Sequence, residues 1–577
     1  RVKETFGNEA IFAGSYGWAS AGRFHHAQSQ VHRFLNQFGG YTASVNSYST
    51  AAAQVIVPHV LGRKFLDILD TSTAWPVIAD HCELIVMFGG IPLKNAQVNA
   101  GGVGRHVTRD WLMRCHRRGT QFVNISPLQK DAADFLKAKW LPLRPNSDTA
   151  LMLGLAHTLA SDGLHDEAFL KSHCRGYERF EPYLFGRGDG QVKDAEWAAR
   201  ICGIAADEIR SLAHLMASRR TMITLAWSLQ RGDHGEQPYW MAIVLAAMLG
   251  QIGLPGGGVG FGYAAESAVG NPIRRLSGPT LNQGRNPITG FIPVARIADL
   301  LLNPGKSFAY NGKTYEYPDT RLVYWCGGNP FHHHQDLNRL VEAWQKPDTV
   351  IVHEPWWNAL AKHADIVFPA ATALERNDIG RASNDDYLFA MERALPPRGE
   401  ARSDFEIFSG LADKLGFEEV FTEGRSEEEW LRHLYDLFRQ QASAEEITLP
   451  DFADFWKAGK LRLPVDDSKR ILFEEFRSDP ARHPLDTPSG RIEIFSETIE
   501  SFGYDDCPGH PMWLEPQEWL GGEGAQTYPL HLVSNQPTTR LHSQLDCGAV
   551  SLESKINGRE PVMIHPEDAA KRGIEDG

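Results

Sequence analysis

A serine at the start of an expected helix is the first residue of this chain that could do chemistry. In the segment VNSYSTAAAQVIVPHVLG, residues 45–62, Ser49 and Thr50 precede an alanine-rich helical pattern. A serine in this position commonly caps the helix, because its hydroxyl accepts a hydrogen bond from a backbone N–H of the first turn. The alternative is a serine oxygen directed from the helix N-terminus into a cleft. No histidine–aspartate pair lies nearby and no Gly-x-Ser-x-Gly elbow is present, so a hydrolase nucleophile is not supported.

Two large aromatic residues stand in a run of small ones near the start of the chain. The stretch GSYGWASAG, residues 14–22, contains Tyr16 and Trp18. Glycine and serine favour turns, and an aromatic residue beside a turn usually anchors a core. The functional alternative is that the phenol and the indole line a binding site, and the stretch alone leaves both interpretations open.

Histidine and cysteine patterns argue against a metal site built by the chain alone. HHHQD, residues 332–336, holds three consecutive histidines, which we expect to point in different directions, whereas metal ligands usually lie further apart. We interpret them as a nucleotide-contacting helix start or as surface, without a metal. The seven cysteines are scattered singly with no CxxC pair, so no iron–sulfur or zinc site is predicted.

Composition indicates a large globular protein. The 577 residues are 42% apolar, enough for several cores, and roughly three to five domains are expected. A formal charge of -14 makes a nucleic-acid-binding surface unfavourable. No apolar run reaches the ~18–20 residues of a membrane span, and MAIVLAAMLGQIG from Met241 predicts a buried helix. Sparse, unpaired cysteines fit the cytoplasm and also the periplasm. The chain begins without a methionine or a signal-peptide pattern, and we expect both ends to be missing.

One unit recurs along the chain and predicts the fold class. A short apolar strand leads through a small or polar turn into a helical pattern, in residues 82–96, 121–135, 221–237, 321–344 and 349–370. Near-continuous apolar strands alternating with helices are typical of parallel sheets covered on both faces. The predicted class is therefore α/β.

The turns after these strands point to a ligand. Ligands of such sheets bind beyond the carboxyl ends of the strands, where backbone N–H groups and glycine turns allow close approach. Those ends carry Gly89-Gly90, Ser126-Pro127, Trp227-Ser228 and residues 327–330, which together favour an extended nucleotide ligand. LPGGGVGFG, residues 254–262, follows a helix and fits no Gly-x-Gly-x-x-Gly register, so NAD binding is not supported and a loop is expected there.

Many collinear segments resemble the dimethyl sulfoxide reductase family of molybdopterin enzymes. Among them are IFAGSYGWASAGRFHHAQ, YSTAAAQVIVPHVLG, AWSLQRGDHGEQPYWM, GGNPFHHHQDLNR and RLHSQL. The nearest branch holds biotin sulfoxide, dimethyl sulfoxide and trimethylamine N-oxide reductases, and CPGHPMWLEP favours the biotin or methionine sulfoxide end. This resemblance implies a bis(molybdopterin guanine dinucleotide) molybdenum cofactor, with four sulfurs supplied by the cofactor itself and no iron–sulfur cluster visible in this chain. Ser49 matches the serine that coordinates the metal, and Tyr16 and Trp18 match the aromatic residues over it.

The resemblance also implies contacts to the two nucleotide arms of the cofactor. Carried over residue by residue, the first set is Gly17, Trp18, Lys94, Asn95, Ser126, Pro127, Asp148, Trp227, Ser228 and Arg231. The second set is Gly328, Asn329, Pro330, His334, Asp365, Asn535, Arg540, His542 and Ser543. An acidic side chain suits the N–H donors of guanine, and arginine or lysine suits pyrophosphate.

The domain organisation that the resemblance implies is discontinuous. Residues 1–72 and 293–424 are expected to form one α/β domain that holds one dinucleotide, and residues 73–292 a second Rossmann-like domain that holds the other. Residues 425–525 are expected to be a mixed α+β segment, and residues 526–577 the start of a truncated C-terminal β-barrel domain.

The implied activity is the two-electron reduction of a sulfoxide or an amine N-oxide by oxygen-atom transfer. The implied partners are the oxide substrate and an electron donor, which is a c-type cytochrome, a flavoprotein or a reduced pyridine nucleotide system. The alternative is a structural or electron-transfer subunit that keeps the fold without the cofactor. Retention of Ser49, Tyr16 and Trp18 together favours the enzyme.

Overall fold

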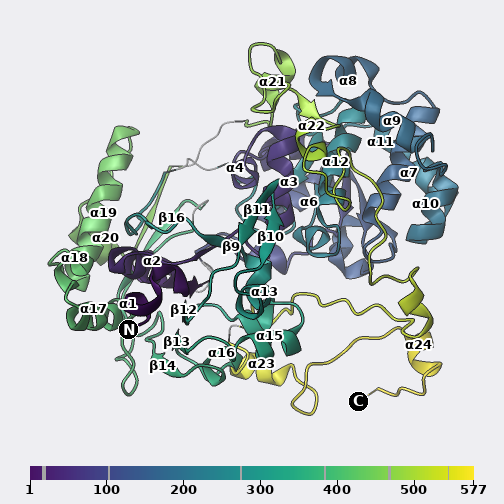
Figure 1. The fold of residues 1–577 in the computed structure, drawn as a ribbon. Coiled ribbons are helices and arrows are strands. Elements are labelled where there is room, and N and C mark those ends of the chain that lie inside the picture. The colour runs from purple at the N-terminus through teal and green to yellow at the C-terminus, as the bar shows by residue number, and fades with distance from the viewer. Residues whose placement is uncertain are drawn as a thin grey trace.

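Two parallel sheets organise the chain (Figure 1). The computed structural model describes residues 1–15, 21–101, 104–272, 276–382, 385–464, 469–543 and 545–576. Each sheet is covered by helices on both faces, as the strand–turn–helix units predict, and the predicted α/β class is confirmed.

The four-stranded sheet joins the N-terminus to residues beyond 320. Its order is β1 (Ile11–Gly14), β12 (Leu322–Cys326), β13 (Thr349–Glu354) and β14 (Ile366–Pro369), all parallel. One face packs on α2 (Ala27–Phe38), α17 (Asp404–Leu415) and α19 (Glu427–Ala444). The other face packs on α13 (Ile297–Leu302) and α15 (Leu337–Ala343).

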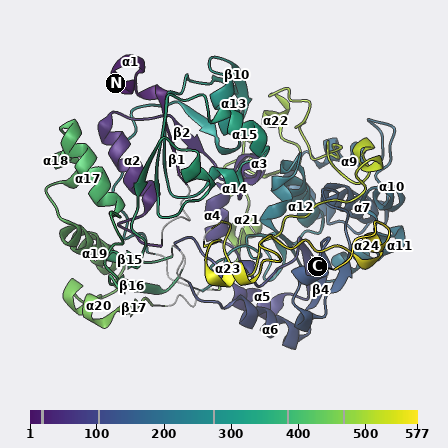
Figure 2. The same cartoon turned by 90° about the horizontal axis from the view of Figure 1, so that it is seen from below.

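The five-stranded sheet lies in the other half of the molecule. Its order is β5 (Lys139–Leu141), β4 (Gln121–Ile125), β3 (Leu84–Phe88), β7 (Thr221–Leu225) and β8 (Gly258–Phe261), again all parallel. One face is covered by α5 (Trp75–His81) and α6 (Thr108–Arg118), and the other by α3 (Ala51–Leu61), α7 (Asp148–Ser161) and α12 (Glu236–Met248). Viewed from below, the α2–α17 side and the α7–α10 side lie apart, with α3 between them (Figure 2).

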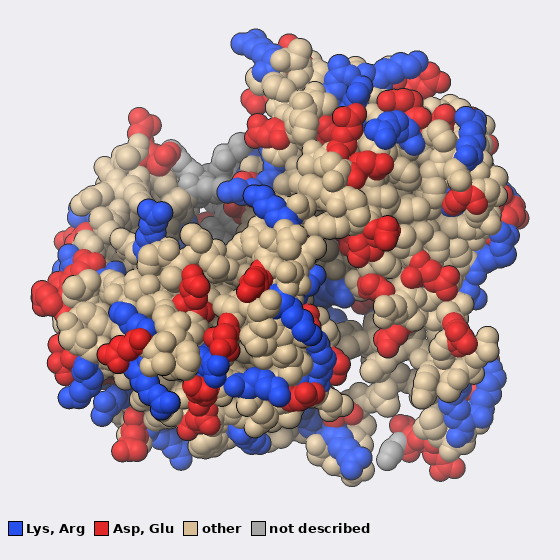
Figure 3. Space-filling view, in the orientation of Figure 1, with Lys and Arg blue, Asp and Glu red and all other residues tan. Residues whose placement is uncertain are grey.

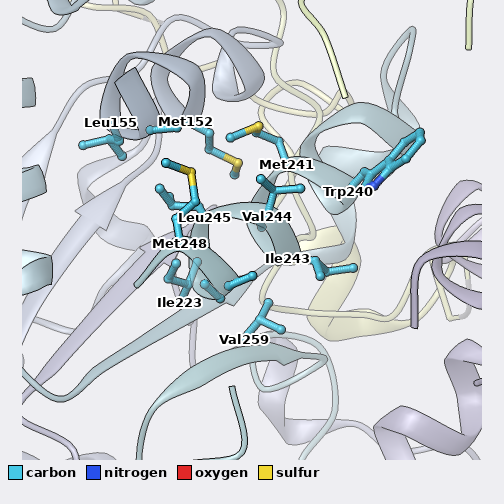
Figure 4. Close-up of a cluster of buried hydrophobic side chains, with 14 of the residues drawn as sticks. Met152, Leu155, Ile223, Trp240, Met241, Ile243, Val244, Leu245, Met248 and Val259 are labelled. Carbon is cyan, nitrogen blue, oxygen red and sulfur yellow. The ribbon is translucent and has the colours of Figure 1, made fainter. Parts of the chain in front are cut away.

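Helix α12 is the centre of the largest core. Every residue from Gln237 to Met248 is buried, which confirms the predicted buried helix. Its apolar side chains meet Met152 and Leu155 of α7 and Ile223 and Val259 of the sheet (Figure 4). Among the described residues no helix is both long enough and apolar enough to cross a membrane.

The glycine-rich segment 254–262 differs from the expected loop, because its second half is strand β8. Glycine is required there by packing: a Cβ on Gly260 would lie 2.4 Å from Cε2 of the Tyr263 ring. The segment therefore extends the sheet, and its bare backbone accommodates a side chain of the protein.

The smaller sheets connect distant segments. The antiparallel set is β15 (Asp378–Gly380), β16 (Tyr387–Met391) and β17 (Lys460–Arg462). β2 (Ala43–Val45) pairs with β9 (Phe291–Pro293), β10 (Ser307–Tyr310) with β11 (Lys313–Glu316), and β18 (Ile492–Glu493) with β6 (Cys174–Arg175).

The last part of the chain departs from the sequence pattern. The resemblance implies the start of a β-barrel domain in residues 526–577, yet the described residues of 528–546 form no strand. Tyr528 and Leu532 are each 78% exposed. A strand needs a neighbouring strand to satisfy its backbone, and no described segment pairs with this one.

Candidate active site

The turn that carries Ser49 joins β2 to α3. Thr50, not Ser49, is the N-cap residue of α3, and it makes no side-chain capping hydrogen bond. The hydroxyl of Ser49 makes no hydrogen bond to any described residue, although its backbone N–H points to the Ser47 hydroxyl at 3.2 Å. The capping interpretation of Ser49 is therefore wrong, and the oxygen is free for another partner.

Gln230 holds this turn in place, and the sequence reasoning missed it. Its Nε2 donates to the carbonyl oxygens of Ser49 (2.7 Å) and Tyr48 (3.1 Å), while its Oε1 accepts from the N–H of Ala52 (2.9 Å). Gln230 lies on the 3₁₀ turn η6 (Trp227–Arg231) after β7 and is 5% exposed. The signal that could have found it is its place in WSLQR, between two predicted contacts.

Replacing Gln230 tests this clamp. Gln230→Leu removes three hydrogen bonds and leaves two carbonyls without their partner, so we expect unfolding free energy to fall by about 1–3 kcal/mol and turnover to drop as the serine turn loosens. Chemical denaturation and steady-state kinetics measure both. Gln345→Leu, at an exposed position, is the matched control and should change neither. Equal stability of the two variants would contradict the clamp.

The residues predicted over the metal, Tyr16, Gly17 and Trp18, lie outside the described residues. The described chain shows where the segment begins: β1 ends at Gly14, and the Ser15 hydroxyl donates to the Cys326 carbonyl at the end of β12. The segment thus leaves from the carboxyl edge of the four-stranded sheet, where ligands of such sheets bind.

The turn after β12 reaches the serine turn. Asn329 caps the short helix α14 (Pro330–His333) by accepting the N–H of Phe331 at 3.1 Å, and Gly328 has the left-handed φ of 78° that this tight turn requires. The Tyr48 hydroxyl lies 2.5 Å from Nδ1 of His334. Desolvation lowers the pKa of His334 to about 4, so the imidazole is neutral at pH 7 and its hydrogen bond with the Tyr48 hydroxyl is uncharged.

Three histidines converge here, against expectation. Ring nitrogens of His332, His333 and His542 all lie within 4.8 Å of one another. The prediction that the consecutive histidines point in different directions is therefore wrong for His332 and His333. The third ring comes from a segment more than 200 residues later, which spacing could not reveal. Desolvation lowers the pKa of His333 to about 3 and of His542 to about 4, and the charge of Arg231 acts in the same direction on both.

Arg231 determines which kind of ligand the cluster of three histidines favours. Arg231 is exposed at its surface side, and desolvation by the neighbouring protein lowers its pKa. No described carboxylate forms an ion pair with it. A guanidinium repels a metal cation and attracts an anion, so the cluster suits a phosphate more than a metal ion.

The first set of predicted contacts leaves buried polar atoms without partners. Among the described residues, Oδ1 of Asn95 and Nε1 of Trp227 are buried and make no hydrogen bond. Lys94 donates to the carbonyl of Gln536 at 2.6 Å. The turn that carries Lys94 and Asn95 therefore contacts the last segment of the chain. Native proteins rarely leave such atoms unsatisfied, so they indicate a ligand. The Ser126 hydroxyl, in contrast, already has a partner within the chain, because it donates a hydrogen bond to Asp131 at 2.6 Å.

Asp148 faces a cavity. Desolvation raises its pKa to about 7. The cavity walls are Asn146, Asp148, Thr149, Leu229, Asp233, His234, Gln237, Pro238, Met512, Trp513, Leu514 and Pro516. A carboxyl group beside an indole in such a space can pair with the N–H donors of a purine and stack on its ring.

One predicted contact, Asp365, is not brought to the site. Asp365 precedes β14 and is bonded to the N–H of Val350 at 2.7 Å, at the amino edge of the sheet. Arg540 donates to Ser551 and Glu560 of its own segment and lies near the histidine cluster, where desolvation and the Arg540 charge lower the pKa of His332. At the carboxyl edge stands Glu354 instead, 9% exposed, with its pKa raised to about 7 by desolvation.

The other predicted contacts have these positions. Pro127 and Ser543 are half-buried, Pro330 is buried as the first residue of α14, and Ser228 and Asn535 are exposed.

Comparison with known proteins shows the family of the chain. The family described as "Molybdopterin oxidoreductase" matches residues 1–414, and "Molydopterin dinucleotide binding domain" matches residues 530–577. A biotin sulfoxide reductase of Cereibacter sphaeroides is 50% identical over the whole chain and 77% of its own length. A dimethyl sulfoxide/trimethylamine N-oxide reductase of the same organism is 45% identical, and a trimethylamine-N-oxide reductase of Haemophilus influenzae 44%, each over all of this chain and 71% of the relative. Acetylene hydratase from Pelobacter acetylenicus has a similar fold, with a TM-score of 0.68, 17% identity, and coverage of 100% of this chain and 76% of that one.

Proposed function

Because the chain belongs to the molybdopterin oxidoreductase family, we propose that it reduces a sulfoxide or an amine N-oxide by two electrons at a molybdenum centre. Three relatives that are 44–50% identical carry sulfoxide or N-oxide reductase names. The observation that carries the proposal is the Ser49 hydroxyl, which is free of hydrogen bonds to described residues on a turn fixed by Gln230. A structural or electron-transfer subunit without the cofactor would have no partner for this hydroxyl, so the observation favours the enzyme.

The donor set fits a bis(molybdopterin guanine dinucleotide) cofactor. Arg231, His333 and His542 suit its phosphates, Asp148 suits a guanine, and Asn95 and Trp227 offer unpaired buried atoms. When bound, this group supplies a Lewis-acidic, two-electron redox centre.

The residues of the chain then have separate tasks. Ser49 supplies the protein oxygen to the metal, and Gln230 fixes its position through the backbone on both sides. Tyr16 donates a hydrogen bond to the substrate oxygen as negative charge grows on it, and Trp18 excludes water from one side. Tyr48, bonded to His334, ties the serine turn to the turn after β12.

The remaining parts of the proposal concern organisation and partners. The dinucleotides lie on two α/β domains, residues 1–72 with 293–424 and residues 73–292, beside the segment 425–525. Residues 526–577 begin a β-barrel domain. Electrons come from a c-type cytochrome, a flavoprotein or a reduced pyridine nucleotide system.

A substrate panel with a reduced viologen dye tests the proposal. Preparations loaded with molybdenum should oxidise the dye with biotin sulfoxide, methionine sulfoxide, dimethyl sulfoxide or trimethylamine N-oxide. Metal and guanine analysis on the same samples should give about one molybdenum per chain. A folded, molybdenum-loaded enzyme that reduced none of the four oxides would contradict the proposal.

A further inference from the structure

Helix α6 and the segment packed on it carry a local excess of positive charge. Residues 105–139 hold eight lysines and arginines against three aspartates, whereas the whole chain has a formal charge of -14. The helix packs on η5 (Asp134–Leu136), where the Arg109 guanidinium lies 5.6 Å over the ring of Phe135. Both elements therefore contribute to one surface, and α6 lies at the outer edge of the molecule (Figure 2).

Most of these cations have no acidic partner. Three of them form ion pairs, which are Arg105 with Asp386, Arg114 with Asp80 and Lys139 with Glu208. The other five are exposed and form no ion pair within the described residues. These five, which we call the α6 face, are Arg109, Arg117, Arg118, Lys130 and Lys137.

Few carboxylates near the α6 face are free to neutralise it. Asp131 accepts the Ser126 hydroxyl at 2.6 Å and is half-buried. Asp110 and Asp134 are the two other aspartates of residues 105–139, and both are exposed. Five unpaired cations against these two carboxylates leave the α6 face positive. In contrast, the side of the molecule drawn in Figure 3 has acidic and basic side chains interspersed.

The α6 face adjoins a turn that is proposed to hold the cofactor. The N–H of Ile91, in the turn after β3, donates to the carbonyl of Asp131 at 2.9 Å, one residue after Lys130. The same turn leads to Asn95, whose buried Oδ1 has no hydrogen-bond partner among the described residues. A protein bound to the α6 face at its Lys130 end therefore lies beside this turn, at the carboxyl edge of the five-stranded sheet.

The pattern of charge favours a compact acidic protein over a nucleic acid. A long polyanion would extend beyond the α6 face onto a chain with a formal charge of -14, which would repel it. A compact protein with one acidic patch avoids this repulsion, because its charge meets only the five cations. Arginine and tryptophan are enriched in protein interfaces, and Trp140, next to Lys139 on β5, is 36% exposed.

We propose that the α6 face binds an acidic electron-donor protein, which delivers its electrons beside the turn at residues 89–95. The donor loses two electrons for each oxide that is reduced. Together with two protons from the solvent, these electrons convert the sulfoxide or N-oxide into the sulfide or amine and one water. The inference rests on the proposed oxide reduction and adds the place where the electrons enter.

The test uses reduced flavodoxin, a small acidic flavoprotein, as the electron donor to the loaded holoenzyme. For wild type we expect kcat/KM for flavodoxin to fall about 10-fold from about 20 mM to about 200 mM salt, because salt screens the attraction. Arg109→Glu with Lys130→Glu, and Arg117→Glu with Arg118→Glu, should each lower kcat/KM for flavodoxin about 10- to 100-fold. Turnover with a reduced viologen dye should stay within about twofold of wild type in both variants, because a small dye needs no docking surface.

The matched control is Arg200→Glu. Arg200 is an exposed arginine in the last turn of α10 (Ala195–Cys202). This helix packs on α7, which covers the opposite face of the five-stranded sheet from α6. The kcat/KM of Arg200→Glu for flavodoxin should equal that of wild type.

Three results would overturn the inference. The first is unchanged use of flavodoxin by both double variants. The second is the absence of electron transfer from flavodoxin to an enzyme that the viologen dye reduces. The third is tighter binding of single-stranded RNA or of anionic lipid vesicles than of flavodoxin at about 150 mM salt, which would give the α6 face a different partner. Failure of the viologen dye to drive any oxide reduction would instead reject the proposed function itself.

Discussion

Ser49→Ala is expected to lower turnover about 10³-fold or more while the protein stays folded. The substitution removes the oxygen that we propose the chain offers to the metal, and several kcal/mol of transition-state stabilisation at about 1.4 kcal/mol per tenfold give that factor. Stability should change little, because the hydroxyl makes no hydrogen bond to described residues and the turn is held through its backbone. The measurement is dye-coupled oxide reduction per bound molybdenum.

The control for this variant is Ser47→Ala, two residues earlier in the same turn. The Ser47 hydroxyl accepts the Ser49 N–H at 3.2 Å. Removing this one hydrogen bond should lower turnover only slightly, far less than Ser49→Ala does. If Ser49→Ala and Ser47→Ala were equally active, Ser49 would have no special place in the reaction.

Asp378→Ala is expected to cost about 3–5 kcal/mol of unfolding free energy. Asp378 is 1% exposed, and its carboxylate accepts four backbone N–H groups, those of Arg23, Phe24, His25 and Ile379, at 2.7 to 3.1 Å. Alanine would leave these donors buried without partners, and hydrogen bonds to a charged group are the strong ones. Chemical denaturation monitored by circular dichroism measures the change.

Asp413→Ala provides the surface comparison for Asp378→Ala. Asp413 is 59% exposed in α17, so its removal should stay within about 0.5 kcal/mol. Asp378→Asn should fall between the two, because one acceptor oxygen remains. An Asp378→Ala protein as stable as wild type would show that residues 23–25 are held by other contacts.

The parts of the fold that follow from local pattern could be predicted. The parallel strands and their turns rest on short apolar runs such as residues 84–88 and 221–225, and the buried α12 rests on its all-round apolar surface. The strand at residues 258–261 was missed because glycine has low strand propensity and is required there by the ring of Tyr263.

Sequence patterns could single out candidate site residues by their type, but they could not show contacts that only the fold makes. Ser49 stood out by its place before a helix, whereas Gln230 acts through backbone groups 181 residues away in the chain. His332 and His333 meet His542 only through the fold. Asp365 was expected at the site from its motif, but it precedes its strand and therefore lies at the opposite edge of the sheet from Glu354.

The most direct test of the account is X-ray absorption spectroscopy at the molybdenum edge on loaded wild type and loaded Ser49→Cys. If Ser49 supplies the protein ligand, the cysteine variant should show one more sulfur neighbour and one fewer oxygen neighbour than wild type. Identical coordination in the two proteins would contradict the central claim.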